Sequence, residues 1–415
     1  MNTPTLTRRQ LLKGACAAYA ATVTARLWTP GAAFAADGLA DHTLVTVFLR
    51  GGLDGLSAVV PVNDSTYHAL RPTIAVPGAA NWMLDDTFGL HPALAPLHEL
   101  RDMLAVVHST GQPEATRSHF DAMFNVESGT SDDGTGWLTR HVRSAGLTAA
   151  PLHAVAWGSS PPASMLGHTG AVSLASIDSF HISSAGGVRE PLLVALRDLY
   201  AGDDVLSGGA QATFRAIDEV ANIREHGPQT AVTYPTSHLG RSLADIARTV
   251  KSDVGLVAAT VDVGGWDTHE AMGNQSEGRM VRLLDDLGRS LAAFAQDLPG
   301  RLDDVTVVVL SEFGRRVREN GSRGLDHGRG NAMLVLGGGV AGGVYGDWLG
   351  LDDDVLDGGD VPAVNDYRHV LGEVVSRRAG NPNVDEVFPG FTTVPLGFAP
   401  VATPFEDHPL APYAH

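Results

Sequence analysis

The sequence has a single cysteine, few basic residues and no long hydrophobic run. Cys16 is the only cysteine among 415 residues, so the chain holds no pair that could form an internal disulfide. Lysine and arginine number 29 against 47 aspartates and glutamates, and the net charge of −18 repels phosphate backbones, so nucleic acid is not an expected partner. No segment approaches the roughly 20 apolar residues of a membrane span, so stable membrane insertion is not expected either.

The rest of the composition is that of a globular protein. Hydrophobic residues make up 44% of the chain and charged residues 18%, which excludes wholesale disorder. Glycine is abundant, with 48 residues scattered without a period. That pattern excludes a collagen-like chain and indicates many tight turns.

The first 35 residues have the features of an export signal. A basic segment containing Arg8 and Arg9 precedes a short apolar stretch and a small-residue cleavage site that ends at Ala35. The adjacent arginines resemble the twin-arginine signal, which predicts the twin-arginine translocase as a partner and a periplasmic or extracellular location. A chance arginine pair in a general secretory signal is the alternative. Cleavage would also remove Cys16, leaving no thiolate ligand or cysteine nucleophile in the mature chain.

Apolar runs alternate with helical patterns along residues 36–415. The runs that predict strands are Leu44–Leu49, Leu104–Val107, Ala154–Trp157, Leu256–Val261, Val305–Leu310 and Ala332–Leu336. Helical periodicity is clearest at Pro191–Tyr200, Ala210–Arg224, Leu243–Val250, Glu277–Gln296 and Tyr367–Arg378. This alternation predicts an α/β fold, with a mostly parallel central sheet and helices on both faces. Since no linker or repeat interrupts residues 36–415, we expect a single domain there.

Ligands of such sheets collect at the carboxyl ends of the strands. The acidic and histidine side chains that the sequence places in these loops are Asp54, Asp267, His269, Glu312, Asp326 and His327. Among them, Asp267, His269 and His327 predict a metal site, because one carboxylate and two imidazoles suit Zn²⁺, Mn²⁺ or Fe²⁺ and leave positions open for a substrate. The alternative is that Asp267 caps its turn and His269 bonds to it.

Other residues in these loops also have two interpretations. Asp54 lies in a glycine-flanked turn, where it could approach a ligand or bond its own backbone. Glu312 could bind a metal or form a salt bridge with Arg315 or Arg316. Those arginines could instead hold an oxyanion through bidentate hydrogen bonds.

Ser118 opens a predicted helix that runs to Glu127. Its hydroxyl could cap that helix, or it could act as a nucleophile beside a metal and at the positive end of the helix dipole. His119 is expected to be a poor base for Ser118, because consecutive helical residues point about 100° apart. The sequence therefore predicts that His119→Ala lowers activity less than His327→Ala.

Two common site motifs are missing or misleading. The glycine run at 337–342 matches a dinucleotide fingerprint, but the residues after it do not continue as a helix. There is no GxSxG nucleophile elbow, which argues against the usual α/β-hydrolase.

Several motifs together resemble one exported bacterial family. They are LRGGLDGLSAVVP (49–61), TRSHFDAMFNVESG (116–129), GGWDTHE (264–270), LSEFGRR (310–316) and LDHGRGNAMLVLGGGV (325–340), followed by NDYRHVLGEVV and VFPGF. The family is the one called domain of unknown function 1501, which is similar to the alkaline phosphatase and sulfatase superfamily. The resemblance implies an alkaline phosphatase-like fold and a divalent metal, Zn, Mn, Ca or Mg.

The resemblance also implies roles for particular residues. Ser118 stands where the superfamily has its nucleophile, and Arg315 is a further candidate catalytic residue. The implied metal ligands are Asp54, Asp267, His269, Glu312, Asp326 and His327. Phe313 stands where the superfamily has a histidine ligand, so the second metal site has lost a ligand.

Two functions follow as expectations. The first is an exported metal-dependent hydrolase of phosphate or sulfate esters, acting on an anionic small-molecule or glycan ester. The alternative is an exported protein that uses the same fold to bind glycans or anions without turnover.

Overall fold

The structure is a computed structural model and describes residues 42–114, 116–147, 150–168, 170–182 and 189–400. The predicted export signal lies outside these residues. The strands of the central sheet are β1 (Thr43–Leu49), β4 (Leu104–Gly111), β5 (Ala154–Trp157), β6 (Val172–Leu174), β7 (Ala258–Val263), β8 (Val305–Leu310), β9 (Asn331–Leu336), β10 (Gly343–Tyr345) and β11 (Asn365–Asp366). A separate small sheet pairs β2 (Val59–Pro61) with β3 (Phe88–Leu90).

The central sheet has the order β10-β4-β9-β8-β1-β7-β5-β6, with β11 beside β4. Each predicted strand is present, at closely similar bounds. Every pairing between these strands is parallel except those of β9, which runs antiparallel to both β4 and β8. The predicted mostly parallel α/β sheet is therefore confirmed.

The sheet separates two hydrophobic cores. All seven residues of β1 are buried, and they alternate between the two sides. Val45, Val47 and Leu49 belong to one core, whereas Leu44 and Phe48 belong to the other. This alternation follows from the two-residue period of a strand, and it explains why the strand sequences are continuously apolar.

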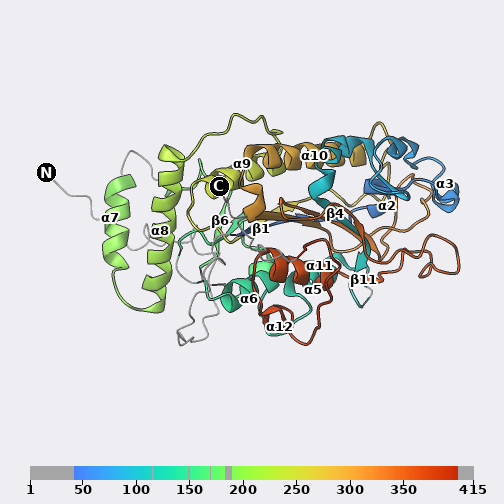
Figure 1. Cartoon of the computed structure of the whole chain (residues 1–415). Helices are drawn as coiled ribbons and strands as arrows, with labels where there is room; N and C mark the ends of the chain where they lie inside the picture. The colour runs from blue at the N-terminus through green and yellow to red at the C-terminus, as the bar shows by residue number, and fades with distance from the viewer. Residues whose placement is uncertain (1–41, 115, 148–149, 169, 183–188, 401–415) are drawn as a thin grey trace, which may run out of the picture.

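Helices cover both faces of the sheet (Figure 1). One face carries α9 (His238–Lys251) and α10 (Arg279–Asp297). The other carries α5 (His119–Ser128), α6 (Trp137–Ser144), α11 (Tyr367–Glu373) and α12 (Val384–Val387). Two further helices, α7 (Arg189–Leu199) and α8 (Val205–His226), lie side by side at one end of the sheet.

The helices begin and end where the sequence supplies capping residues. Asp204 caps α8 and Ser237 caps α9, each by accepting from backbone N–H groups of the first turn. Gly129 ends α5 in the left-handed region, at φ 64°. The predicted helix at 367–378 is present as α11 followed by a π-helical turn. No helix among the described residues is long and apolar enough to cross a membrane.

Candidate metal centre

Several loops meet at one edge of the central sheet. Asp267 and His269 lie in the loop after β7, and His119 is the first residue of α5, which follows β4. The carboxyl ends of β1, β4, β7 and β8 all lie at this edge, because these strands run in the same direction. His327 precedes β9, and since β9 runs the other way, its first residue lies at the same edge. Strand direction therefore brings together residues that are far apart in the sequence.

We call His119, Asp267, His269 and His327 the histidine–aspartate cluster. Asp267 Oδ1 lies 3.1 Å from His269 Nε2 and 3.6 Å from His327 Nε2, and Asp267 Oδ2 lies 3.7 Å from His119 Nε2. The Nε2 atoms of His269 and His327 are 2.9 Å apart. Donors around a tetrahedral Zn²⁺ are about 3.3 Å apart, because Zn–N bonds are about 2.0–2.1 Å long. His119, Asp267 and His327 each offer a ligand atom within 4.8 Å of the other two, a spacing that suits a single small cation, and His269 Nε2 lies beside Asp267 and His327.

Each histidine of the cluster is oriented by an acceptor behind it. His119 Nδ1 lies 2.7 Å from Glu312 Oε1, and His269 Nδ1 lies 3.3 Å from Asp326 Oδ1. His327 Nδ1 lies 2.8 Å from the backbone carbonyl oxygen of Arg117. Carboxylates and carbonyls only accept hydrogen bonds, so each Nδ1 carries the proton and donates it. When the rings are neutral in this tautomer, each Nε2 keeps its lone pair, which can coordinate a cation.

This arrangement meets the requirements of a metal site. His119 Nε2 is buried and has no hydrogen-bond partner in the described structure. Burial and the nearby positive charges lower the pKa of His327, which keeps its imidazole neutral and able to coordinate. Metal-bound histidines commonly donate their other N–H to a carboxylate or carbonyl, as all three do here. The residues present therefore fit a divalent cation.

Arg315 holds Asp267 in place. Its Nη2 donates to Asp267 Oδ1 at 2.6 Å, and its other donors reach the carbonyls of Gly52 and Leu325. Partial burial opposes ionisation of Asp267, but the hydrogen bond and charge of Arg315 outweigh it and lower the pKa of the carboxyl. Because the Arg315 side chain is fully buried among these acceptors, it positions Asp267 and does not present a free guanidinium to a ligand.

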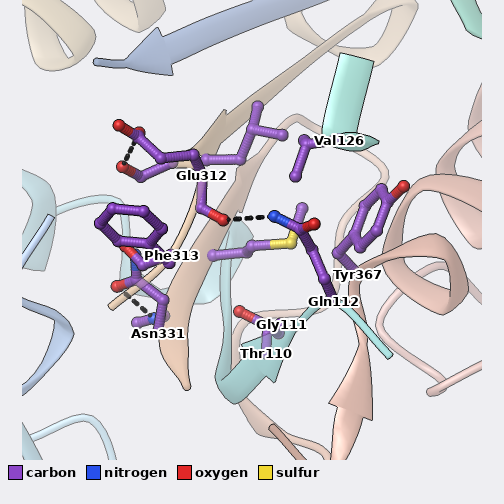
Figure 2. Close-up of a pocket in the computed structure, with 12 residues that line it drawn as sticks. Thr110, Gly111, Gln112, Val126, Glu312, Phe313, Asn331 and Tyr367 are labelled. Atoms are coloured by element: carbon purple, nitrogen blue, oxygen red, sulfur yellow. Dashed lines mark hydrogen bonds between the residues drawn. The ribbon is translucent and has the colours of Figure 1, made fainter. Parts of the chain in front are cut away.

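Glu312 is buried and held from both sides. Its Oε1 also accepts from Gly51 N at 2.8 Å, and its Oε2 accepts from Ser311 Oγ at 2.9 Å. Behind it, Gln112 Nε2 donates to the carbonyl of Glu312 at 2.8 Å, and Asn331 Nδ2 donates to the carbonyl of the next residue at 2.7 Å (Figure 2). These bonds fix the turn after β8, and Glu312 contacts the cluster only through His119.

The structure does not bring Asp54 into this set of contacts. Both its carboxylate oxygens accept from Arg71, at 2.6 and 2.9 Å, in a pair that is almost completely buried. Arg71 also donates to the carbonyl of Val317. Asp54 therefore neutralises a buried arginine, and its charge is already compensated.

Ser118 is the N-cap of α5. Its Oγ accepts from the backbone N–H of Asp121 at 3.4 Å, which is the bonding expected of a capping serine. His119, the next residue, points to Glu312 and the cluster. Asp326 contacts the cluster through His269, as an outer partner.

His119 is the site residue that the sequence interpretation missed. The sequence presents His119 only as a possible base for Ser118, whereas its ring in the structure reaches Glu312, which is 193 positions away in the chain. Phe313 packs against two histidines of the cluster, with ring centroids 4.9 Å from His119 and 4.7 Å from His327. In the sequence, the role of His119 is indicated only by the Ser-His pair at a helix start, together with carboxylates in the other loops.

Arginines border the cluster. Arg117 pairs with Asp360 at 2.7 Å, Arg316 lies 3.3 Å from the same carboxylate, and Arg329 pairs with Asp357. Burial raises the pKa of Asp360 against the effect of these arginines. This rim therefore carries three guanidinium groups, paired with Asp357 and Asp360, in a chain whose net charge is −18.

Comparison with solved structures finds weak similarities. The lipoteichoic acid synthase LtaP of Listeria monocytogenes is 11% identical, with 73% of this chain and 67% of that chain covered and a TM-score of 0.32. The phosphonate monoester hydrolase of Agrobacterium radiobacter is 9% identical, with 71% and 68% covered and a TM-score of 0.31. The PsFucS1 sulfatase of Pseudoalteromonas sp. is 13% identical, with 73% and 64% covered and a TM-score of 0.29.

Comparison with curated proteins gives no match. Comparison with protein families does give one, over residues 113–363, to the family described as protein of unknown function (DUF1501). The match spans more than half of the chain and contains every residue of the histidine–aspartate cluster. The chain therefore belongs to the DUF1501 family.

Proposed function

We propose that this protein is a metal-dependent hydrolase of phosphate or sulfate esters. The observation that carries the proposal is that His119, Asp267 and His327 each offer a ligand atom within 4.8 Å of the other two, with His269 Nε2 at 2.9 Å from His327 Nε2 and 3.1 Å from Asp267 Oδ1. His119, Asp267, His269 and His327 would hold the metal, with Glu312 and Asp326 as outer partners. Three imidazoles favour Zn²⁺ or Mn²⁺ over the harder Mg²⁺ and Ca²⁺. When bound, such an ion polarises a phosphoryl or sulfuryl oxygen and supplies Lewis acid catalysis.

The charge around the site supports an anionic substrate. The cluster lies beside three arginines, and Arg117 contributes both its carbonyl to His327 and its half-exposed guanidinium to the rim. Guanidinium groups recognise phosphate and sulfate oxygens well, because their N–H groups can bind two oxygens at once. A neutral ester would gain nothing from this rim.

Ser118 is the proposed nucleophile. Its half-exposed hydroxyl lies at the positive end of α5 and directly precedes His119. Its oxygen would form the new bond to phosphorus or sulfur as the ester oxygen leaves and takes up the serine proton, and water would then cleave the resulting seryl ester and restore the hydroxyl. Ser118→Ala should abolish hydrolysis and leave metal binding unchanged, whereas hydrolysis that survives this change would restrict Ser118 to its capping role.

Metal analysis tests the proposal directly. Mature protein should carry about one equivalent of Zn²⁺ or Mn²⁺ by mass spectrometry, and it should hydrolyse 4-nitrophenyl phosphate or sulfate only when metal is present. Cobalt substitution should give the visible absorption of a low-symmetry site with nitrogen and oxygen ligands. Full hydrolysis in a chelator, with no bound metal, would overturn the proposal.

We further propose that the protein is exported by the twin-arginine route, with cleavage after Ala35. Replacing both Arg8 and Arg9 by lysine should keep the precursor in the cytoplasm with its folded domain intact, as judged by cell fractionation. Normal export of that variant would assign the leader to the general secretory route.

A further inference from the structure

A second polar cavity lies at the same edge of the sheet as the metal centre. It has a volume of about 260 Å³ and is located where β5 and β7 end. Its lining includes Trp157, Ser159, Ser160, Thr260 and Asp262. This volume is near the lower end of the roughly 300–1,000 Å³ of small-molecule sites, so it suits a group of the size of one sugar ring.

The lining favours a neutral, hydroxyl-rich group. Three hydroxyls, from Ser159, Ser160 and Thr260, can each donate and accept, and Asp262 can accept. No lysine or arginine is among the described residues that line the cavity, and His238 is the one imidazole there, so the cavity holds no permanent positive charge for an anion.

Asp262 is held so that it can still accept. Both its carboxylate oxygens accept from Arg50 Nη2, at 2.9 Å each. Each oxygen keeps a second lone pair, and the carboxylate is about half exposed. Arg50 is shared with the buried Glu127, at 2.8 Å, so the three groups carry one net negative charge. That balance favours hydroxyl donors over anions.

The cavity is connected to the metal centre but separated from it. Glu127 lies near the end of α5, whose first residue is His119. Eight residues at 1.5 Å each place them roughly 12 Å apart along the helix axis. Arg50, Glu127 and α5 thus link Asp262 of the cavity to His119 of the cluster.

We propose that this cavity binds a neutral sugar residue of a glycan whose phosphate or sulfate ester lies at the histidine–aspartate cluster. The second half of this statement rests on the proposed function. Sugar binding in the cavity does not depend on it, because none of the lining residues belongs to the cluster.

The test measures binding of neutral trisaccharides to the mature protein. Maltotriose, cellotriose and chitotriose are the probes, followed by saturation-transfer NMR and calorimetry, with Zn²⁺ and with a chelator. The wild type should bind at least one of them under both conditions. The double variant Ser160→Ala, Thr260→Val should weaken binding at least tenfold, because it removes two hydroxyls and keeps the shape of both side chains.

Matched controls separate this effect from general damage. Ser276→Ala and Thr213→Val remove exposed hydroxyls elsewhere and should bind as the wild type does. Ser160→Ala alone changes an exposed residue, so its fold should be intact and its binding measurably weaker. Absence of trisaccharide binding in the wild type, or equal binding by the double variant, would overturn the proposal.

The two proposals fail separately. Sugar binding without metal uptake would overturn the hydrolase and keep the sugar cavity. Metal-dependent hydrolysis of 4-nitrophenyl esters without sugar binding would do the reverse.

Discussion

Two groups of histidines in this protein show the same close approach with opposite chemistry. His153 Nε2 and His168 Nε2 lie 3.1 Å apart, and His269 Nε2 and His327 Nε2 lie 2.9 Å apart. In the first pair, His153 Nδ1 donates to the carbonyl of Ala150, whereas His168 Nδ1 accepts from Gly170 N. His168 Nε2 therefore carries a proton and donates it to His153 Nε2. The hydrogen bonds of this pair are therefore satisfied without any ligand.

In the histidine–aspartate cluster, every Nδ1 faces an acceptor. When the rings are neutral and protonated on Nδ1, their Nε2 atoms face one another as acceptors beside the carboxylate of Asp267. Such an arrangement is unfavourable unless a cation lies among them, because acceptors at this distance repel. The partners behind the rings, rather than the distance between them, distinguish a structural histidine pair from a metal site.

The largest expected effect comes from removing a ligand of the cluster. We expect His119→Ala and His327→Ala each to weaken metal affinity by more than 100-fold and to abolish hydrolysis, since loss of an outer partner alone costs roughly 10–100-fold. The geometry thereby reverses the earlier expectation that His119→Ala is the milder change. Calorimetry with Zn²⁺ and metal analysis measure the effect.

The matched control for this experiment is His168→Ala, from the His153–His168 pair. It should retain full metal stoichiometry and activity. Equal metal loss in this variant would remove the distinction between the two groups. A wild type that takes up no divalent metal would show that a shared proton, rather than a metal ion, bridges the ligand atoms of the cluster.

A smaller effect is expected from Glu312→Gln. The amide keeps one acceptor but loses the charge that orients His119, so metal affinity should fall by roughly 10–100-fold. Glu373→Gln is the control, because Glu373 is equally buried but accepts only backbone N–H groups of residues 396–399. That variant should lose stability and keep its metal affinity, whereas parallel loss of metal in both would point to general unfolding.

Breaking the His153–His168 pair should lower the stability of the fold and leave the metal site unchanged. His168→Ala leaves the buried His153 Nε2 without its donor, which costs about 1–3 kcal/mol in the free energy of unfolding. Urea denaturation measures this cost. His226→Ala, at an exposed position, should leave the midpoint unchanged. A midpoint for His168→Ala equal to that of the wild type would mean that the pair contributes nothing.

The last effect concerns the stability of the fold in acid. Burial, with the positive charges of His153 and Arg143, lowers the pKa of His168 to about 4, against 6.5 for an ordinary histidine. The unfolded chain therefore takes up a proton first, and stability falls as the pH drops from 6.5 towards 4. Each such histidine contributes up to about 1.4 kcal/mol per pH unit in that window. His168→Ala should flatten the slope of unfolding free energy between pH 6.5 and 5, and an unchanged slope would show that His168 does not titrate as inferred.

The local sequence was sufficient to predict the secondary-structure elements and the family. Strands such as Val305–Leu310 are buried on both faces, so their continuously apolar composition identifies them. The helix that starts after Ser118 has a capping serine at its start and a glycine at its end. Asp267, His269 and His327 were predicted together and do lie together, because the loop after β7 and the loop before the antiparallel β9 meet at the same edge of the sheet. The membership in DUF1501 was predicted from motifs, and the family comparison confirms it.

Long-range pairing decided the rest. Asp54 has the same glycine-flanked context as a ligand, but Arg71 neutralises it, and no local pattern shows which arginine folds back. The ring of His119 contacts Glu312 only because α5 packs beside the end of β8, which makes it a cluster member rather than a neighbour of Ser118. Arg315 looks like an anion-binding residue in sequence and is buried on backbone carbonyls in the structure.

The sequence by itself thus determined which elements form and which loops carry ligands, because strand burial, helix caps and loop composition are local properties. The tertiary structure alone decided which side of each imidazole faces the site. That choice depends on acceptors supplied by distant segments, from Glu312, Asp326 and the carbonyl of Arg117. Hydrogen-bond polarity is set by the partner, and the partner is set by the fold.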